Sequence, residues 1–120
     1  MMPELARLSL DTAGDVAVAH VAGEVDASNV ESLSQRLLEG ISNKARALVI
    51  DLRETSYIDS SGISLIFDAA ARLHNRRQKL RLVVTPESCV DEVLSAVSIE
   101  ESVPVDAEVE EALRAVDEAG

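Results

Sequence analysis

The sequence predicts an α/β fold: a single-layer mixed β-sheet of four or five strands with about four α-helices. Short apolar runs alternate with amphipathic segments of helical period, which favours strands that lie parallel in one sheet. The first two apolar segments are separated only by turn residues at 12–15, which predicts an N-terminal antiparallel hairpin. The chain has 120 residues, 47% of them hydrophobic, and no linker, so we expect one domain over 1–120 with a core over about 5–116.

The hairpin strands are expected at 5–10 and 16–21, followed by a short loop at 22–26. A helix over about 27–38 comes next, because Ser28 and Glu31 have the spacing of a capping box. Its buried face is expected to contain Val30, Leu33, Leu37, Leu38 and Ile41. Gly40 marks its expected end.

Residues 47–52 form a nearly continuous apolar run, which is typical of a strand covered on both faces. The next helix is expected from about Ser60 to Asn75. Its apolar stripe comprises Ile63, Ile66, Phe67, Ala70, Leu73 and His74.

The last third of the chain predicts a buried strand at 80–84 and a helix opened by Thr85 and Pro86. The apolar stripe of that helix is Val90, Val93, Leu94 and Val97. A short edge strand at 102–105 follows. Asp106 is expected to cap a final helix whose inward residues are Val109, Ala112, Leu113 and Val116.

The composition limits the classes of partner. The chain has 22 acidic and 11 basic residues, a net charge of −11, which disfavours nucleic acid and favours a basic protein surface. A single cysteine, Cys89, makes no internal disulfide and no zinc cage. The start of the chain lacks signal-peptide features, and no apolar run is long enough to span a bilayer, so we expect a cytoplasmic protein without membrane association.

The residues that carry chemistry gather at Asp59-Ser60-Ser61-Gly62, between a buried strand and a helix. Ligands in α/β layers collect beyond the carboxyl ends of the strands. The segment Gly23-Glu24-Val25-Asp26 follows the neighbouring strand, so we expect the two segments to meet. The rim would then carry Glu24, Asp26, Asp51 and Asp59 around two serines.

Two interpretations of this turn remain open on the residues alone. Asp and Ser are ordinary helix N-caps, and Gly62 would then only permit close packing. However, two serines exceed what one cap needs. A phosphate on either serine would meet the amide groups and positive end of a helix, and also the acidic neighbours. Such a group would act as a switch without refolding.

The chain resembles the STAS-domain anti-sigma factor antagonists. The resemblance rests on residues 23–26, on the strand at 48–52 and on the turn at 57–63, and in element order it extends from about residue 5 to 116. It implies that Ser60 is the phosphoacceptor. It also implies that the unphosphorylated protein binds an anti-sigma factor, usually a serine kinase, and that a serine phosphatase reverses the modification. A monomer or weak homodimer is expected, with no catalytic role, metal or cofactor. The alternative is a STAS module of a stress-signalling scaffold or a transporter complex.

Other residues of the chain are candidates for contacts or chemistry. Helical geometry places Leu65 opposite the apolar stripe, either as an ordinary exposed leucine or as a partner anchor beside Ser60. A serine hydrolase would need a histidine base, but the Gly-x-Ser-x-Gly elbow is absent and only His74 follows the serines. His20 and His74 are expected to be packed or rim residues, and Cys89 a small buried one. No phosphate-binding loop supports a nucleotide site.

Overall fold

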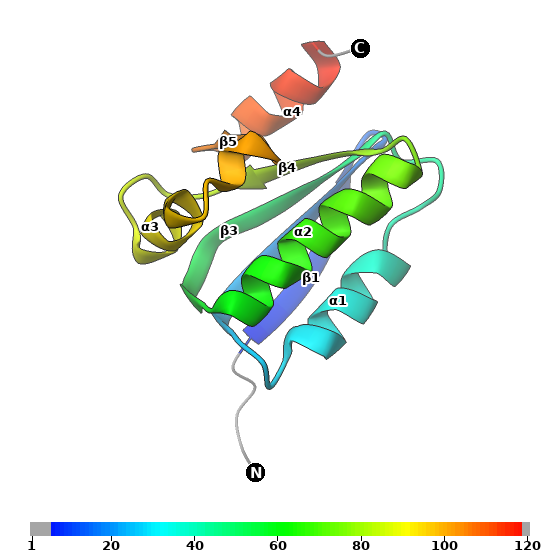
Figure 1. Cartoon of the computed structure of the whole chain (residues 1–120). Helices are drawn as coiled ribbons and strands as arrows, with labels where there is room; N and C mark the ends of the chain where they lie inside the picture. Colours follow the sequence, from blue (N-terminus) through cyan, green and yellow to red (C-terminus); the bar gives the residue numbers. More distant parts are fainter. Residues whose placement is uncertain (1–5, 119–120) are drawn as a thin grey trace.

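The computed structural model describes residues 6–118, and its framework is one five-stranded sheet in the order β1-β2-β3-β4-β5 (Figure 1). β1 (Ala6–Ala13) pairs antiparallel with β2 (Val16–Val25). β3 (Ala47–Ile58), β4 (Lys79–Val83) and β5 (Val105–Asp106) continue in parallel. The predicted mixed sheet and N-terminal hairpin are confirmed. Leu5, which was expected in the first strand, lies outside the described residues.

Helices cover both faces of this sheet. α1 (Val30–Glu39), α2 (Ser60–Asn75) and α3 (Cys89–Ala96) pack on one face, where Leu48, Ile50 and Leu82 are buried. α4 (Val109–Glu118) packs on the other face through Ala112 and Val116. A short 3-10 helix, Ile99–Glu101, precedes β5. Within residues 6–118, none of the helices has the length and apolar character that crossing a membrane requires.

The central strands β2 and β3 are longer than the sequence predicts. Their pairing continues through Gly23 opposite Thr55 to Val25 opposite Ile58, across two irregularities in register. The Thr55 hydroxyl donates to the carbonyl of Val21 at 2.8 Å and bridges the first irregularity. The polar stretch after Leu52 hid this extension. The segment at 22–25 is therefore strand, whereas a loop was expected.

Three of the predicted helix caps are wrong. The Ser28 hydroxyl donates to the Asp26 carboxylate at 2.5 Å instead of forming a capping box, and α1 begins only at Val30. Ser88, not the Thr85-Pro86 pair, caps α3, because its hydroxyl oxygen accepts the Asp91 amide at 3.1 Å.

Asp106 lies in β5 instead of capping α4, and its carboxylate accepts from Arg81 Nε at 2.8 Å. The last strand is correspondingly displaced from the expected 102–105 to Val105–Asp106. Because the Asp106 carboxylate forms this ion pair, it is not available to cap α4. The position of the last strand therefore depends on this side-chain contact and could not be read from the apolar pattern.

The buried stripe of α2 also differs from the expected one. Its fully buried members are Gly62, Ile66, Ala69 and Leu73, while Ile63 and Ala70 are partly buried. His74 is exposed and Phe67 is 36% exposed. Val97, directly after α3, is likewise exposed, at 42%. The predicted apolar stripe of α2 was rotated slightly about the helix axis from the observed buried face. Phe67 was therefore predicted to be in the core, although it lies at the surface.

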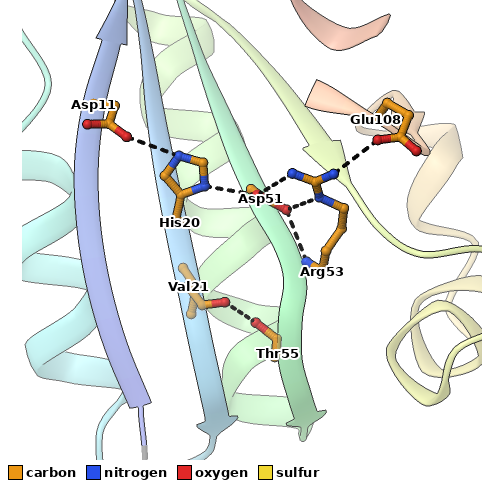
Figure 2. A network of polar contacts seen from close by, with 7 residues as sticks. All are labelled: Asp11, His20, Val21, Asp51, Arg53, Thr55 and Glu108. Atoms are coloured by element: carbon orange, nitrogen blue, oxygen red, sulfur yellow. Dashed lines mark hydrogen bonds and ion pairs between the residues drawn. The ribbon is translucent and has the colours of Figure 1, made fainter. Parts of the chain in front are cut away.

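A charged network crosses the sheet on the face that α4 covers (Figure 2). Asp51, only 4% exposed, lies with Oδ2 2.9 Å from His20 Nδ1, and its Oδ1 accepts from Arg53 Nε at 3.0 Å. Arg53 Nη1 reaches Glu108 at 3.0 Å, and His20 Nε2 lies 3.2 Å from Asp11. The network links β1, β2 and β3 to the residue before α4. The expectation that Asp51 lies at the rim with the serines is wrong, because β3 continues from it to Ile58.

The environment of Asp51 keeps its carboxylate charged. Burial raises the pKa of Asp51, but hydrogen bonds from Arg53 and His20 outweigh burial, so this pKa lies below its ordinary value of 3.8. A carboxyl with a depressed folded-state pKa adds stability above the pKa of its unfolded state. That contribution is lost as pH falls through the lower folded-state pKa.

We expect Asp51→Asn to lower the free energy of unfolding by about 3 kcal/mol at neutral pH, because it leaves Arg53 and His20 without their buried anion. Urea unfolding measures this loss. The difference between the two proteins should begin to shrink as pH falls below about 4, where the unfolded carboxyl becomes protonated, and should vanish only below the lower pKa of the folded state. Asp68→Asn, at an exposed ion pair with Arg72, is the matched control and should leave stability nearly unchanged. Equal effects of the two variants would contradict this account.

Candidate functional site

The candidate site lies where β3 ends and α2 begins, and Asp59 makes this junction. Its backbone is extended, with φ −107° and ψ −170°. Its Oδ1 accepts the amide of Ser61 at 2.8 Å and that of Gly62 at 3.2 Å, and its carbonyl accepts the amide of Ile63 at 3.0 Å. Asp59 is thus the N-cap of α2. The amides of Ser61 and Gly62, which were expected to be free for a phosphate, already donate to Asp59.

The three residues after this cap differ in exposure. Ser60 is exposed, Ser61 is partly buried and Gly62 is buried. A Cβ on Gly62 would lie 2.4 Å from Ile58 Cγ1 and 3.0 Å from Val25 Cγ1, so a side chain does not fit there without displacing the strand ends. Only Ser60 therefore combines a hydroxyl with full access to a partner at this turn.

The end of β2 lies beside the same turn, as the sequence predicts. The Asp59 amide donates to the carbonyl of Val25 at 3.2 Å, directly after the pair formed by Val25 and Ile58. Gly23 has φ +94°, in the left-handed region that favours glycine. The two segments that carry the candidate residues are therefore joined by backbone hydrogen bonding.

Asp26 and Asn29 shape the connection from β2 to α1. The Asp26 carboxylate accepts the Ser28 amide at 2.9 Å, and Asn29 Nδ2 donates to the carbonyl of Glu24 at 2.8 Å. Asn29 Oδ1 in turn accepts the Asp26 amide at 3.1 Å. Asn29 was missed from the sequence, although asparagine is a frequent residue at helix starts. Asp26 holds its own turn, which leaves the side chain of Glu24 as the exposed acid of this segment.

Leu65 lies in a groove between α1 and α2 rather than alone on the surface. The groove is lined by Val30, Leu38, Ser61, Leu65, Asp68 and Arg72. Leu65 is partly buried, packs against the core and also borders an apolar cavity of about 30 Å³. Replacing it would therefore disturb the core as well as any partner contact. The interpretation of Leu65 as a freely exposed leucine is wrong.

Two exposed aromatic residues flank Ser60 in the sequence. Tyr57 is 47% exposed and Phe67 is 36% exposed, and they are the only aromatic residues of the chain. Seven residues span about two turns of helix, so Phe67 lies on the same face of α2 as Ser60, about 10 Å along the axis. Sequence reasoning assigned Phe67 to the core. Its spacing from Ser60 was the signal that could have revealed this shared face.

The histidines and the cysteine lie apart from this turn. His20 belongs to the network on the opposite face of the sheet, and His74 lies near the far end of α2, about 20 Å along the helix from Ser60. Neither is placed to serve as a base for a nucleophilic Ser60. Cys89 is exposed at the first residue of α3, whereas a buried position was expected.

The family model for the STAS domain matches residues 7–112. The chain belongs to the STAS domain family. Several solved structures have the same fold as this chain. An anti-sigma factor antagonist from Mycobacterium paratuberculosis has a TM-score of 0.84 at 20% identity, covering 93% of this chain and 94% of the other. SpoIIAA in its unphosphorylated form has a TM-score of 0.74 at 20% identity, covering 93% of this chain and 97% of the other. Phosphorylated SpoIIAA from Bacillus has a TM-score of 0.68 at 21% identity, covering 92% of this chain and 99% of the other.

We expect Asp59→Ala to lower the free energy of unfolding by about 1 kcal/mol, because it removes the acceptor of two first-turn amides of α2. Asp59→Asn keeps a side-chain oxygen at the cap and should cost only a fraction of that. Denaturant unfolding of both variants measures the difference. A loss as large in Asp59→Asn as in Asp59→Ala would show that the charge, not the cap, carries the effect.

Proposed function

We propose that this STAS protein is a cytoplasmic anti-sigma factor antagonist whose activity is controlled at Ser60. The unphosphorylated form binds an anti-sigma factor that is also a serine kinase, and so releases the sigma factor. Phosphorylation of Ser60 switches binding off, and a serine phosphatase restores it. The observation that carries the proposal is the position of Ser60, exposed directly after the Asp59 cap and beside the end of β2. The fold is also that of SpoIIAA, which exists in phosphorylated and unphosphorylated forms.

A phosphate at Ser60 would act mainly through charge. It adds about −1.5 to −2 charges at neutral pH, at a turn that already carries Asp59 and the exposed Glu24. The helix dipole favours an anion there, but the amides of Ser61 and Gly62 are engaged by Asp59. The added charge therefore stays exposed to the partner. If the apolar centre of the partner's surface docks over Ser60, it would bury this unpaired charge, so binding is lost without any change in fold.

The surface around Ser60 suits a protein partner. Phe67 exposes its ring on the face of α2 that carries Ser60, Tyr57 is exposed three residues before Ser60, and aromatic residues often provide most of the energy of an interface. The groove that contains Leu65 opens next to Ser61 on the α1 side. The net charge of −11 favours a partner with a basic rim. We place recognition on this surface and no catalytic step within the STAS protein itself.

The kinase assay tests the site directly. The protein is mixed with ATP and each anti-sigma kinase of its host, and modified positions are located by mass spectrometry. We expect one phosphate on Ser60, none in Ser60→Ala, and undiminished modification in the matched control Ser64→Ala, an exposed serine of the same helix. Ser60→Asp should lose the complex and Ser60→Ala should keep it. Modification of another residue, or equal binding by both Ser60 variants, would refute the switch.

We expect Phe67→Ala to weaken binding of the anti-sigma factor about tenfold, corresponding to about 1.4 kcal/mol. Because Phe67 is 36% exposed, its replacement should lower the melting temperature less than replacement of a fully buried residue. Val97→Ala removes a similarly exposed apolar side chain directly after α3 and should leave affinity unchanged. Isothermal titration calorimetry with the unphosphorylated proteins measures both. Equal affinities of wild type and Phe67→Ala would remove this face of α2 from the interface.

A further inference from the structure

β1 forms an open edge of the sheet on the side away from β5 (Figure 1). The Val21 carbonyl accepts from Thr55 of β3, so the backbone groups of Val21 point away from β1. Leu8 is the β1 residue opposite Val21, and its own backbone groups must therefore point outward. Arg36 confirms this direction, because its Nη2 donates to the Leu8 carbonyl at 3.1 Å from outside the sheet. By alternation along the strand, Ala6, Leu8, Leu10 and Thr12 present their backbone groups at the edge.

The side chains of this edge strand are arranged symmetrically about Ser9. Arg7 and Asp11 lie two residues before and after it, on the sheet face where Asp11 meets His20 (Figure 2). Leu8 and Leu10 lie one residue before and after it, on the other face. Leu10 remains 39% exposed. A strand with this arrangement is complementary to a second copy of itself that runs in the opposite direction.

We propose that two copies of this chain associate through antiparallel pairing of their β1 strands, with Ser9 opposite Ser9 of the second copy. Leu8 of each copy then exchanges backbone hydrogen bonds with Leu10 of the other copy. Arg7 lies opposite Asp11 of the second copy, and symmetry repeats this ion pair. Ala6 lies opposite Thr12 of the second copy, so the pairing covers residues 6–12 of each strand.

The charges select this register over its neighbours. The outward-facing groups alternate, so the strands can also be centred on Arg7, Leu8, Leu10 or Asp11. Centring on Arg7 opposes two arginines, and centring on Asp11 opposes two aspartates. Centring on either leucine places Ser9 opposite a charged residue and forms no ion pair. Only the register centred on Ser9 pairs opposite charges.

Two features keep this association weak and reversible. Arg36 must release the Leu8 carbonyl, which then accepts the incoming amide instead. The net charge of −11 on each copy also opposes contact. Paired edge strands form a small interface, and interfaces below about 1,200 Å² belong to transient complexes. Charged side chains at a sheet edge are also a known means of limiting uncontrolled strand pairing.

Disulfide trapping tests the register. In a Cys89→Ser background, Ser9→Cys places two thiols opposite each other at a Cα separation of about 4.5 Å, which suits a disulfide. Thr12→Cys, on the same exposed strand, places them about 20 Å apart. Mild oxidation should convert Ser9→Cys to a covalent dimer at least tenfold faster than Thr12→Cys. Equal rates, or no dimer from Ser9→Cys, would overturn the proposal.

Charge reversal provides an independent test by sedimentation velocity over a concentration series. Wild type should show dimer that increases with concentration, whereas Arg7→Asp and Asp11→Arg should each weaken it at least fivefold. The double variant Arg7→Asp/Asp11→Arg should restore association, and mixing the two single variants should produce a heterodimer. Wild type that stays monomeric at all concentrations, or a double variant that fails to recover, would overturn the proposal. Asp11→Arg also loses its contact with His20, so circular dichroism must first show it folded; if it is unfolded, disulfide trapping decides.

Discussion

The arrangement of this protein depends on Asp59, because one residue ends β3, caps α2 and ties both to β2. Its amide donates to Val25, which extends the parallel pairing to the last residue of β2. Its carboxylate accepts two amides of the first turn of α2, so the helix begins at a fixed position. Gly62 lets the helix start lie directly on Ile58 and Val25. The place of Ser60 in space follows from these contacts.

The two faces of the sheet differ in the contacts they make. The face under α4 contains the buried Asp51 carboxylate, whose contacts to His20 and Arg53 join the strands to the start of the last helix. The other face supports α1 and α2 on an aliphatic core, and the aromatic side chains Tyr57 and Phe67 remain exposed. A charge added to Ser60 therefore lies at a helix start that hydrogen bonds hold in place, and it changes the binding of the partner protein rather than the fold.

The sequence was sufficient for the class of fold, the hairpin and the meeting of the two site segments, because these depend on apolar periodicity and on the alternation of strands with helices. It failed where side chains choose between several partners. Ser28 bonds to Asp26 instead of capping α1, and Asp106 pairs with Arg81 instead of capping α4. The extension of β3 past Leu52 was hidden by polar residues, so Asp51 was wrongly expected at the rim beside the serines, whereas it lies inside the strand. Phe67 was misassigned because its apolar character suggested burial, whereas its helical phase placed it beside Ser60.

The central claim is that phosphorylation at Ser60 blocks a partner without changing the fold. Protein carrying phosphoserine at position 60 can be compared with unmodified protein by amide chemical shifts in NMR, with binding to the anti-sigma factor measured on the same samples. The account predicts shift changes confined to the start of α2 and the end of β2, together with loss of binding. Shift changes throughout the α1 and α2 face, or binding that survives phosphorylation, would contradict it.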